Sequence, residues 1–380
     1  MAWKYALGAI IAVILAGIAF FGLSQPTGLA SLETGNEKIV IGAIQPLTGS
    51  IANIGQNARA AMEIAVEEIN AKGGINGKEL VVKFEDGQCE AKAAATAAKK
   101  LVEVDGVKVI IGGTCSAETM AAAPITEAGK VVQLSNCSSN PAITNAGDYI
   151  FRAYPSDSFQ GEIAAKFAFD DLKARKATIL SCVSEWCAGI KEVFKEKFTG
   201  LGGSIVAEEE FQMDSKDLKT QLLKIRETGP DLVYFLGYTK ESAAGIKQAR
   251  ELGMEAKILG ADAWVDPALW SSTTGSNEGV MYTTVKTPEN QAFVEALEEK
   301  VGKGNGMLYC SSQSYDAVYL IAEALKKCGE NSECIKEELY KVKGLNGLSG
   351  EISFDRNGDL ETAEYAIHIV RNGEAVDYQG

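Results

Sequence analysis

The chain has 380 residues, a formal net charge of −14 and 46% hydrophobic residues, so it is longer than one hydrophobic core usually serves. An acidic surface repels phosphate backbones, and no basic stripe with interleaved aromatics occurs, so nucleic acid is not an expected partner. The single histidine, His368, lies in an alternating stretch typical of a strand. A single histidine does not provide the ligands usual for metal-dependent hydrolysis, and it makes a histidine-based catalytic triad an unexpected feature. We expect no metal and no cofactor.

The N-terminal segment, residues 1–37, predicts the compartment. Lys4 precedes an apolar run at 6–23, and a polar stretch with two glutamates follows it. This charge asymmetry places the bulk of the chain outside the cytoplasm. The run exceeds a typical signal-peptide core and is just long enough to span a bilayer. We predict an uncleaved membrane anchor at 6–23; a signal peptide cleaved near the weak site at 28–30 is the alternative.

Strand and helix patterns alternate from residue 38 in two separate sets. The first set predicts strands at 39–44, 80–84, 107–111 and 131–134, with helices at 55–72, 91–102 and 116–128. The second set predicts strands at 177–181, 204–211, 232–236 and 257–259, with helices at 190–198, 216–228 and 241–252. Such alternation is typical of parallel sheets covered on both faces, so the sequence predicts two doubly wound, Rossmann-like α/β lobes.

The C-terminal part breaks this alternation. A strand at 280–285 is followed by three predicted helices at 291–300, 312–327 and 334–342. Two further strands, 351–354 and 364–370, flank Asn357-Gly358, a hairpin signal. A calcium loop is the alternative for 355–359, but its glycine falls at the fourth position instead of the sixth.

Eight cysteines, an even number, fit an oxidising compartment. Two pairs lie close in sequence, two further cysteines each follow a probable strand, and the last two have no such feature. The sequence leaves the connectivity open, including free buried thiols for some of them. In that order the cysteines are Cys328 and Cys334, Cys182 and Cys187, Cys89 and Cys115, and Cys137 and Cys310.

Three strand ends are unusually polar: residues 112–116, 135–141 and 260–262. In open α/β sheets ligands bind at the carboxyl ends of strands, where helix N-termini offer unpaired N–H groups. Ser116 is placed as a helix N-cap, and hydroxyls with backbone amides suit a carboxylate. Asp262 suits an ammonium, so the three ends together predict a zwitterion site. Alternatively, Ser116 and Asp262 only cap helices.

Two aromatic residues, Trp186 and Tyr238, each lie just beyond a predicted strand of the second set. They could cover an apolar ligand side chain, or pack in the core as aromatic residues more often do. Enzyme motifs are absent: there is no phosphate-binding Gly-Lys-Ser/Thr loop, no nucleophile elbow and no zinc-protease helix. We therefore expect a binding protein and not an enzyme.

Several motifs resemble the periplasmic leucine/isoleucine/valine-binding proteins of ABC transporters. They are Ile-Gly-Ala-Ile-Gln-Pro-Leu-Thr-Gly at 41–49 and Asn-Ala-Lys-Gly-Gly-Ile-Asn-Gly at 70–77, continuing with 85–89, 112–116, Phe151-Arg152, Gly237-Tyr238 and 354–359. The resemblance runs from residue 38 to the end. It implies the type I periplasmic-binding-protein fold, with two lobes joined by three crossings.

The resemblance also implies roles by position. A disulfide would join Cys89 and Cys115, and Ser116 and Ser139 would hold the ligand carboxylate. The carbonyl of Cys137 and the carboxylate of Asp262 would take the ammonium. Trp186 would close over the ligand and Tyr238 would border the cleft. Three positions depart from the family: Ser139 replaces a usual threonine, Trp186 a common tyrosine, and Ile54 an aromatic that often lines the pocket.

Crossings near residues 156, 285 and 347 are expected to form the hinge. They would divide the chain into one lobe of 38–156 with 286–347 and another of 157–285 with 348–380. Binding would shift an open–closed equilibrium. The family implies a monomer that docks on a permease pair and delivers an amino acid of the leucine, isoleucine and valine class.

Three alternatives remain open. A receptor for aliphatic amides, urea or another small organic acid would have no use for Asp262 as an ammonium partner. A ligand-sensing ectodomain fits less well, because only residues 1–5 precede the apolar run and nothing after Gly380 could signal. An enzyme would need a catalytic constellation that the sequence does not offer.

Overall fold

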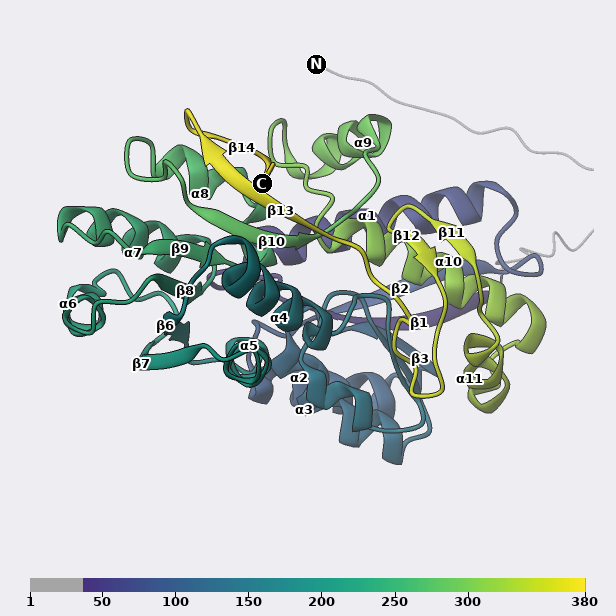
Figure 1. Cartoon of the computed structure of the whole chain (residues 1–380). Helices are drawn as coiled ribbons and strands as arrows, with labels where there is room; N and C mark the ends of the chain where they lie inside the picture. The colour runs from purple at the N-terminus through teal and green to yellow at the C-terminus, as the bar shows by residue number, and fades with distance from the viewer. Residues whose placement is uncertain (1–36, 380) are drawn as a thin grey trace, which may run out of the picture. The chain divides into compact units, whose positions relative to one another are not determined.

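The computed structural model of the chain describes residues 37–379, which form two α/β lobes (Figure 1). The predicted anchor at 6–23, and all of the segment 1–37 except its last residue, lie outside the described residues. Within residues 37–379 no helix is long and apolar enough to cross a membrane.

Lobe 1 is built on a parallel sheet in the order β2-β1-β3-β4-β5. Its strands are β1 (Lys38–Gln45), β2 (Glu79–Asp86), β3 (Val109–Gly112), β4 (Val132–Ser135) and β5 (Ile150–Arg152). Successive residues of β1 enter different cores: Ile41 and Ala43 pack on one face of the sheet, and Val40 and Ile44 on the other. A strand covered on both faces requires the near-continuous apolar run that predicted it.

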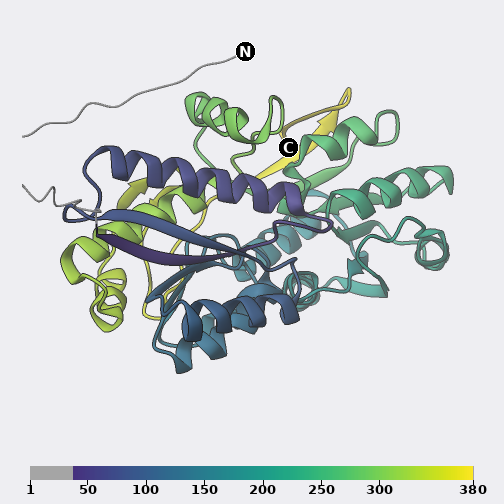
Figure 2. The same ribbon diagram turned by 180° about the vertical axis from the view of Figure 1, so that it is seen from behind.

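Helices cover both faces of the first sheet. α1 (Ala52–Ala71) and α10 (Ser311–Cys328) pack on the face of Ile41, whereas α2 (Ala91–Lys99) and α3 (Ser116–Ala128) pack on the other. Figure 2 shows α1 lying along β1 and β2. Lobe 1 also contains α9 (Gln291–Val301) and α11 (Ser332–Tyr340), which contact α1 and α10.

Lobe 2 repeats the same topology. Its sheet has the order β7-β6-β8-β9-β10, all parallel, and then adds β13 and β14 antiparallel at one edge (yellow in Figure 1). The strands are β6 (Lys176–Cys182), β7 (Ser204–Phe211), β8 (Leu232–Leu236), β9 (Lys257–Gly260), β10 (Met281–Val285), β13 (Tyr365–Arg371) and β14 (Glu374–Asp377). Its helices are α4 (Asp157–Lys166), α5 (Glu185–Gly200), α6 (Lys219–Glu227), α7 (Thr239–Glu251) and α8 (Pro267–Ser272).

The predicted strands and helices of both alternating sets are present, and differ from the structure mainly at their ends. The predicted hairpin is wrong. β12 (Gly350–Ile352) pairs with β11 (Leu345–Gly347), while β13 joins the sheet of lobe 2. The Asn357-Gly358 turn itself exists, closed by an isolated bridge between Phe354 and Leu360. Burial of Phe354 in the core of lobe 1 holds this segment away from β13.

Three crossings connect the lobes, at 153–156, 286–290 and 361–364. The first two lie where the sequence predicted them. The third lies later than the predicted position near 347, because Ile352, Phe354 and Leu360 are buried in the core of lobe 1. The chain therefore enters lobe 2 only with β13, and residues 348–360 belong with lobe 1.

Candidate ligand-binding site

A small cavity of about 20 Å³ lies where the carboxyl ends of both parallel sheets meet. It is bounded by loops that follow β3 and β4 of lobe 1 and β6 and β8 of lobe 2. Six of the seven predicted site residues line it: Ile54, Ser116, Cys137, Ser139, Trp186 and Tyr238. The remaining lining residues are Ile51, Thr114, Cys115, Tyr309 and Cys310.

The lobe 1 wall is polar and anchored by hydrogen bonds. Ser116 is the first residue of α3, and its Oγ accepts a hydrogen bond from the Asn140 N–H at 3.2 Å. Ser116 is not the N-cap that the sequence predicted; Cys115 holds that place. The start of a 13-residue helix thus forms part of the wall, and its N–H groups favour an anion there.

Glu118 secures this wall from behind. Its carboxylate accepts hydrogen bonds from the N–H groups of Cys89 and Cys115, both at 3.0 Å. Burial raises the pKa of Glu118 to about 7. These bonds fix the same two cysteines that a disulfide joins, with Cα atoms 5.4 Å apart. The backbone before α3 is therefore held covalently and by hydrogen bonds.

Arg152 fixes the second polar strand end. Its side chain is fully buried, and its Nε and Nη2 donate to the two oxygens of Asp359 at 2.6 and 2.7 Å. Its Nη1 donates to the carbonyls of Ser139 and Asn140 at 3.1 and 2.9 Å. One bidentate ion pair thus orients the loop that presents Ser139 to the cavity.

Asp262 is buried and does not line the cavity. Its Oδ2 accepts a hydrogen bond from the Tyr154 hydroxyl at 2.6 Å, and its Oδ1 has no partner within the described chain. The Tyr154 ring in turn meets Tyr309, a cavity residue, edge to face at 6.0 Å. Burial raises the pKa of Asp262 to about 6. A buried carboxylate with one free oxygen suits a cationic group.

A second buried carboxylate, Asp157, was missed by the sequence analysis. Its Oδ2 accepts a hydrogen bond from Ser139 Oγ at 2.8 Å, and its Oδ1 has no partner among residues 37–379. Burial raises the pKa of Asp157 well above its ordinary value, and the neighbouring Asp262 charge adds to the shift. The two carboxylates together make this side of the site strongly favourable for a cation.

The lobe 2 wall is aromatic. Trp186 lies in the first turn of α5 and Tyr238 immediately before α7, and their ring centroids are 5.0 Å apart. Both side chains are buried. Hydrogen bonds join the lobes across the cleft, from Asn140 Nδ2 to the Glu185 carbonyl at 2.5 Å and from Asn53 Nδ2 to Asp266 Oδ2 at 3.0 Å. The two lobes are therefore closed around the cavity.

All eight cysteines are paired. The Cys89–Cys115 pair implied by the family resemblance is confirmed, and the structure settles the three pairs that the sequence left open. Cys137 and Cys310, 173 residues apart in sequence, form a disulfide of which both cysteines line the cavity. The other two are Cys182–Cys187 and Cys328–Cys334.

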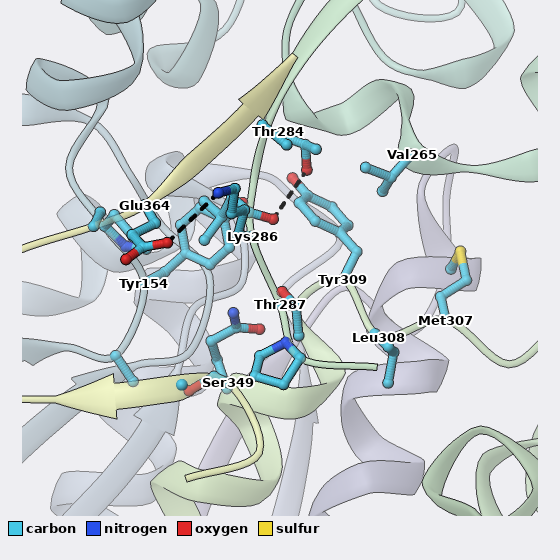
Figure 3. A pocket seen from close by; sticks show the side chains of 18 of the residues that line it. Tyr154, Val265, Thr284, Lys286, Thr287, Met307, Leu308, Tyr309, Ser349 and Glu364 are labelled. Carbon is cyan, nitrogen blue, oxygen red and sulfur yellow. Dashed lines mark hydrogen bonds and ion pairs between the residues drawn. The ribbon is translucent and has the colours of Figure 1, made fainter. Parts of the chain in front are cut away.

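A larger cavity of about 860 Å³ lies at the hinge (Figure 3). All three crossings contribute to its wall, and Lys286 and Glu364 form an ion pair across two of them at 3.6 Å. Tyr309 lines both this hinge cavity and the smaller cavity. Strand-end reasoning did not find Tyr309, Tyr154 or Asp157, because they come from the segment before α10, from the first crossing and from the start of α4.

Comparison with known proteins agrees with this geometry. Residues 38–374 match the periplasmic binding protein family. The chain belongs to this family. A solved leucine-binding protein, LivK from Thermotoga maritima, is 32% identical with a TM-score of 0.80, covering 90% of this chain and 98% of its own. The type I periplasmic-binding-protein fold, expected from the motifs, is thereby confirmed, and the family is extracytoplasmic.

Two further relatives have comparable sequence identity to this chain along nearly their whole length. The branched-chain amino acid transporter substrate-binding protein LivJ from Streptococcus pneumoniae, solved with isoleucine, is 28% identical with a TM-score of 0.79, covering 90% of this chain and 100% of its own. A leucine-, isoleucine-, valine-, threonine- and alanine-binding protein of Pseudomonas aeruginosa is 29% identical over 353 residues, or 92% of this chain and 94% of its own.

Proposed function

We propose that this periplasmic binding protein captures an aliphatic α-amino acid of the leucine, isoleucine and valine class and delivers it to an ABC transporter permease. The observation that carries the proposal is the chemistry of the small cavity. Two hydroxyl-bearing strand ends form one wall, aromatic rings form the other, and two buried carboxylates lie beside it. This arrangement matches a carboxylate, an ammonium and an apolar side chain on one small molecule.

The ligand carboxylate would be held by lobe 1. The Ser116 hydroxyl is free to donate, the Ser139 hydroxyl would turn from Asp157 to the ligand, and the first N–H groups of α3 add a favourable dipole. Charge-assisted hydrogen bonds of this kind are about twice as strong as neutral ones. Because the wall is already fixed by a disulfide and by Arg152, little ordering would accompany binding.

The ligand ammonium would be held by the Cys137 carbonyl and by Asp262, with Asp157 as an additional anionic group. Both aspartates carry an oxygen without a partner in the described chain. Burying a carboxylate without a partner is costly. An ammonium placed between the two aspartates would supply the positive charge that offsets this cost. A neutral amide or urea would leave both buried carboxyl groups without a cationic partner, which argues against that class of ligand.

The ligand side chain would face Ile54, Trp186 and Tyr238, whose surfaces are mainly apolar. The relatives support the same class, since LivJ was solved with isoleucine and the Pseudomonas protein is named for aliphatic amino acids and threonine. None of the lining residues forms a nucleophile–base pair, so we propose binding without catalysis.

Delivery requires the lobes to open and close about the crossings at 153–156, 286–290 and 361–364. We further propose that the protein acts as a monomer and that residues 6–23 anchor it in the membrane outside the cytoplasm. Sequencing the N-terminus of the mature protein tests the anchor; a start near Ser31 would show that the segment is removed.

A thermal-shift screen tests the ligand class. The chain from residue 38 onward is melted with each of the twenty amino acids, acetamide, urea and benzoate. A ligand at 100 times its Kd stabilises the fold by about 2.7 kcal/mol. We expect aliphatic amino acids to raise Tm and the amides to have no effect. A response to an amide, urea or benzoate alone would contradict the ammonium site while leaving the transport role intact.

A further inference from the structure

We infer that Tyr309 and the Cys137–Cys310 disulfide form a rigid partition that restricts the ligand to a small side chain, so that alanine and valine bind better than leucine or phenylalanine. The inference rests on the proposed amino-acid function and narrows its substrate class. It comes from the sizes of two neighbouring cavities and from the side chains that separate them.

The first observation is how little room the closed site offers. The cavity that holds the predicted site residues has a volume of about 20 Å³. A single water molecule requires a cavity volume of about 10–15 Å³. Every ligand must therefore displace wall atoms, and each additional methylene must displace more. Which ligands fit depends on which parts of the wall can move.

The disulfide wall resists movement. Cys310 adopts a left-handed backbone conformation, with φ of 61°, just before α10. Its carbonyl accepts hydrogen bonds from the Ser314 N–H at 3.0 Å and the Ser314 Oγ at 2.6 Å. At the other end, Cys137 follows β4, and the next residue, Ser138, donates its N–H to Ser135 Oγ at 3.0 Å. A cross-link whose two ends are held by hydrogen bonds in this way moves less easily than a free side chain.

Tyr309 separates this crowded site from ample space. Its side chain lines the small cavity on one side and the hinge cavity of about 860 Å³ on the other, as Figure 3 shows for the hinge side. Contact with Tyr154 at 6.0 Å and an interplanar angle of 88° supports the ring. The adjacent disulfide fixes its backbone. The ring is thus the part of the wall whose removal would give the most volume.

The expected consequence is a size limit. In a closed pocket one methylene changes affinity by about 10–200-fold, and extra methylenes forced into a packed site are destabilising. Alanine and valine should bind at least tenfold tighter than leucine and phenylalanine. Truncating Tyr309 should join the two cavities and relieve this limit.

The test is calorimetric titration of the full chain with alanine, valine, leucine and phenylalanine. In Tyr309→Ala we expect affinity for leucine and phenylalanine to rise at least tenfold relative to valine. Tyr309→Phe keeps the ring and should keep the wild-type order. The double variant Cys137→Ala/Cys310→Ala should also admit leucine better, whereas Cys328→Ser/Cys334→Ser, which removes a disulfide outside the site, should not.

The outcomes separate this inference from the function on which it depends. If the wild type binds leucine as tightly as valine, the size limit is wrong while amino-acid capture stands. If Tyr309→Ala keeps the wild-type order, the partition is wrong. If no amino acid binds, the proposed function itself fails. Tyr309→Leu removes the ring while keeping apolar bulk, and is expected to show the same direction of change if Tyr309→Ala does not fold.

Discussion

The two walls of the amino-acid site are built differently. The lobe 1 wall is hydroxyl-rich and held by two disulfides, by Glu118 and by the Arg152–Asp359 pair. The lobe 2 wall consists of Trp186 and Tyr238. Its disulfide, Cys182–Cys187, closes the loop that carries Trp186, but neither of these cysteines lines the cavity. This difference suggests that lobe 1 recognises the ligand before closure and that lobe 2 adds contacts only when the lobes meet.

The largest expected effect concerns the stability of the lobe 1 wall. Arg152→Met would leave Asp359 largely buried and unpaired, and should lower the free energy of unfolding by about 3–5 kcal/mol. Chemical denaturation measures this loss. Lys286→Met is the control, because its exposed pair with Glu364 should contribute less than about 1 kcal/mol. Equal losses in the two variants would mean that Arg152 does not hold the wall.

Replacing Asp262 probes the charge that lobe 2 brings to the ligand. Asp262→Ala would leave the ligand ammonium without its carboxylate in a closed, desolvated cleft, and should cost about 2–5 kcal/mol of binding free energy. Calorimetry measures the affinity, and the melting temperature of the ligand-free variant controls for folding. Retained affinity in a folded variant would move the ammonium site elsewhere, with Asp157 the first position to replace.

Acidification should weaken binding through the same residue. The pKa of Asp262 is raised to about 6 by burial, so the carboxylate gains a proton as the pH falls through that value. The protonated form cannot pair with an ammonium as an anion. Affinity should therefore fall about tenfold between pH 7 and pH 5, which follows from the change in the ionised fraction of a group with this pKa. Asp262→Asn should flatten this dependence; an unchanged profile in that variant would assign the titration to another group.

A smaller effect is expected from one hydroxyl of the lobe 1 wall. Ser139→Ala removes the hydroxyl that donates to Asp157 in this structure and that would turn to the ligand carboxylate on binding, and should weaken binding by about 1 kcal/mol. Ser349→Ala, which changes a residue lining only the hinge cavity, is the matched control. If both variants bind equally well, the carboxylate is held by Ser116 and backbone N–H groups without Ser139.

The sequence by itself determined the local elements and predicted six of the residues that line the small cavity. Apolar runs and helical spacing are set by which faces are buried, so they predicted the alternating strands and helices from residue 38. Polar strand ends predicted Ser116, Asp262 and the stretch 135–141, in which the resemblance singles out Ser139, because the carboxyl ends of parallel strands share an edge. Their place just beyond predicted strands marked Trp186 and Tyr238, and the motifs that resemble known binding proteins supplied Cys137 and Ile54.

Only the tertiary structure decided contacts between distant segments. Burial of Phe354 in lobe 1 overrode the Asn357-Gly358 hairpin signal and moved the third crossing to 361–364. The pairing of Cys137 with Cys310, and the position of Tyr309 between two cavities, depend on how α10 packs on the first sheet. No local pattern encodes such contacts, because they follow from how whole helices and sheets fill a shared core.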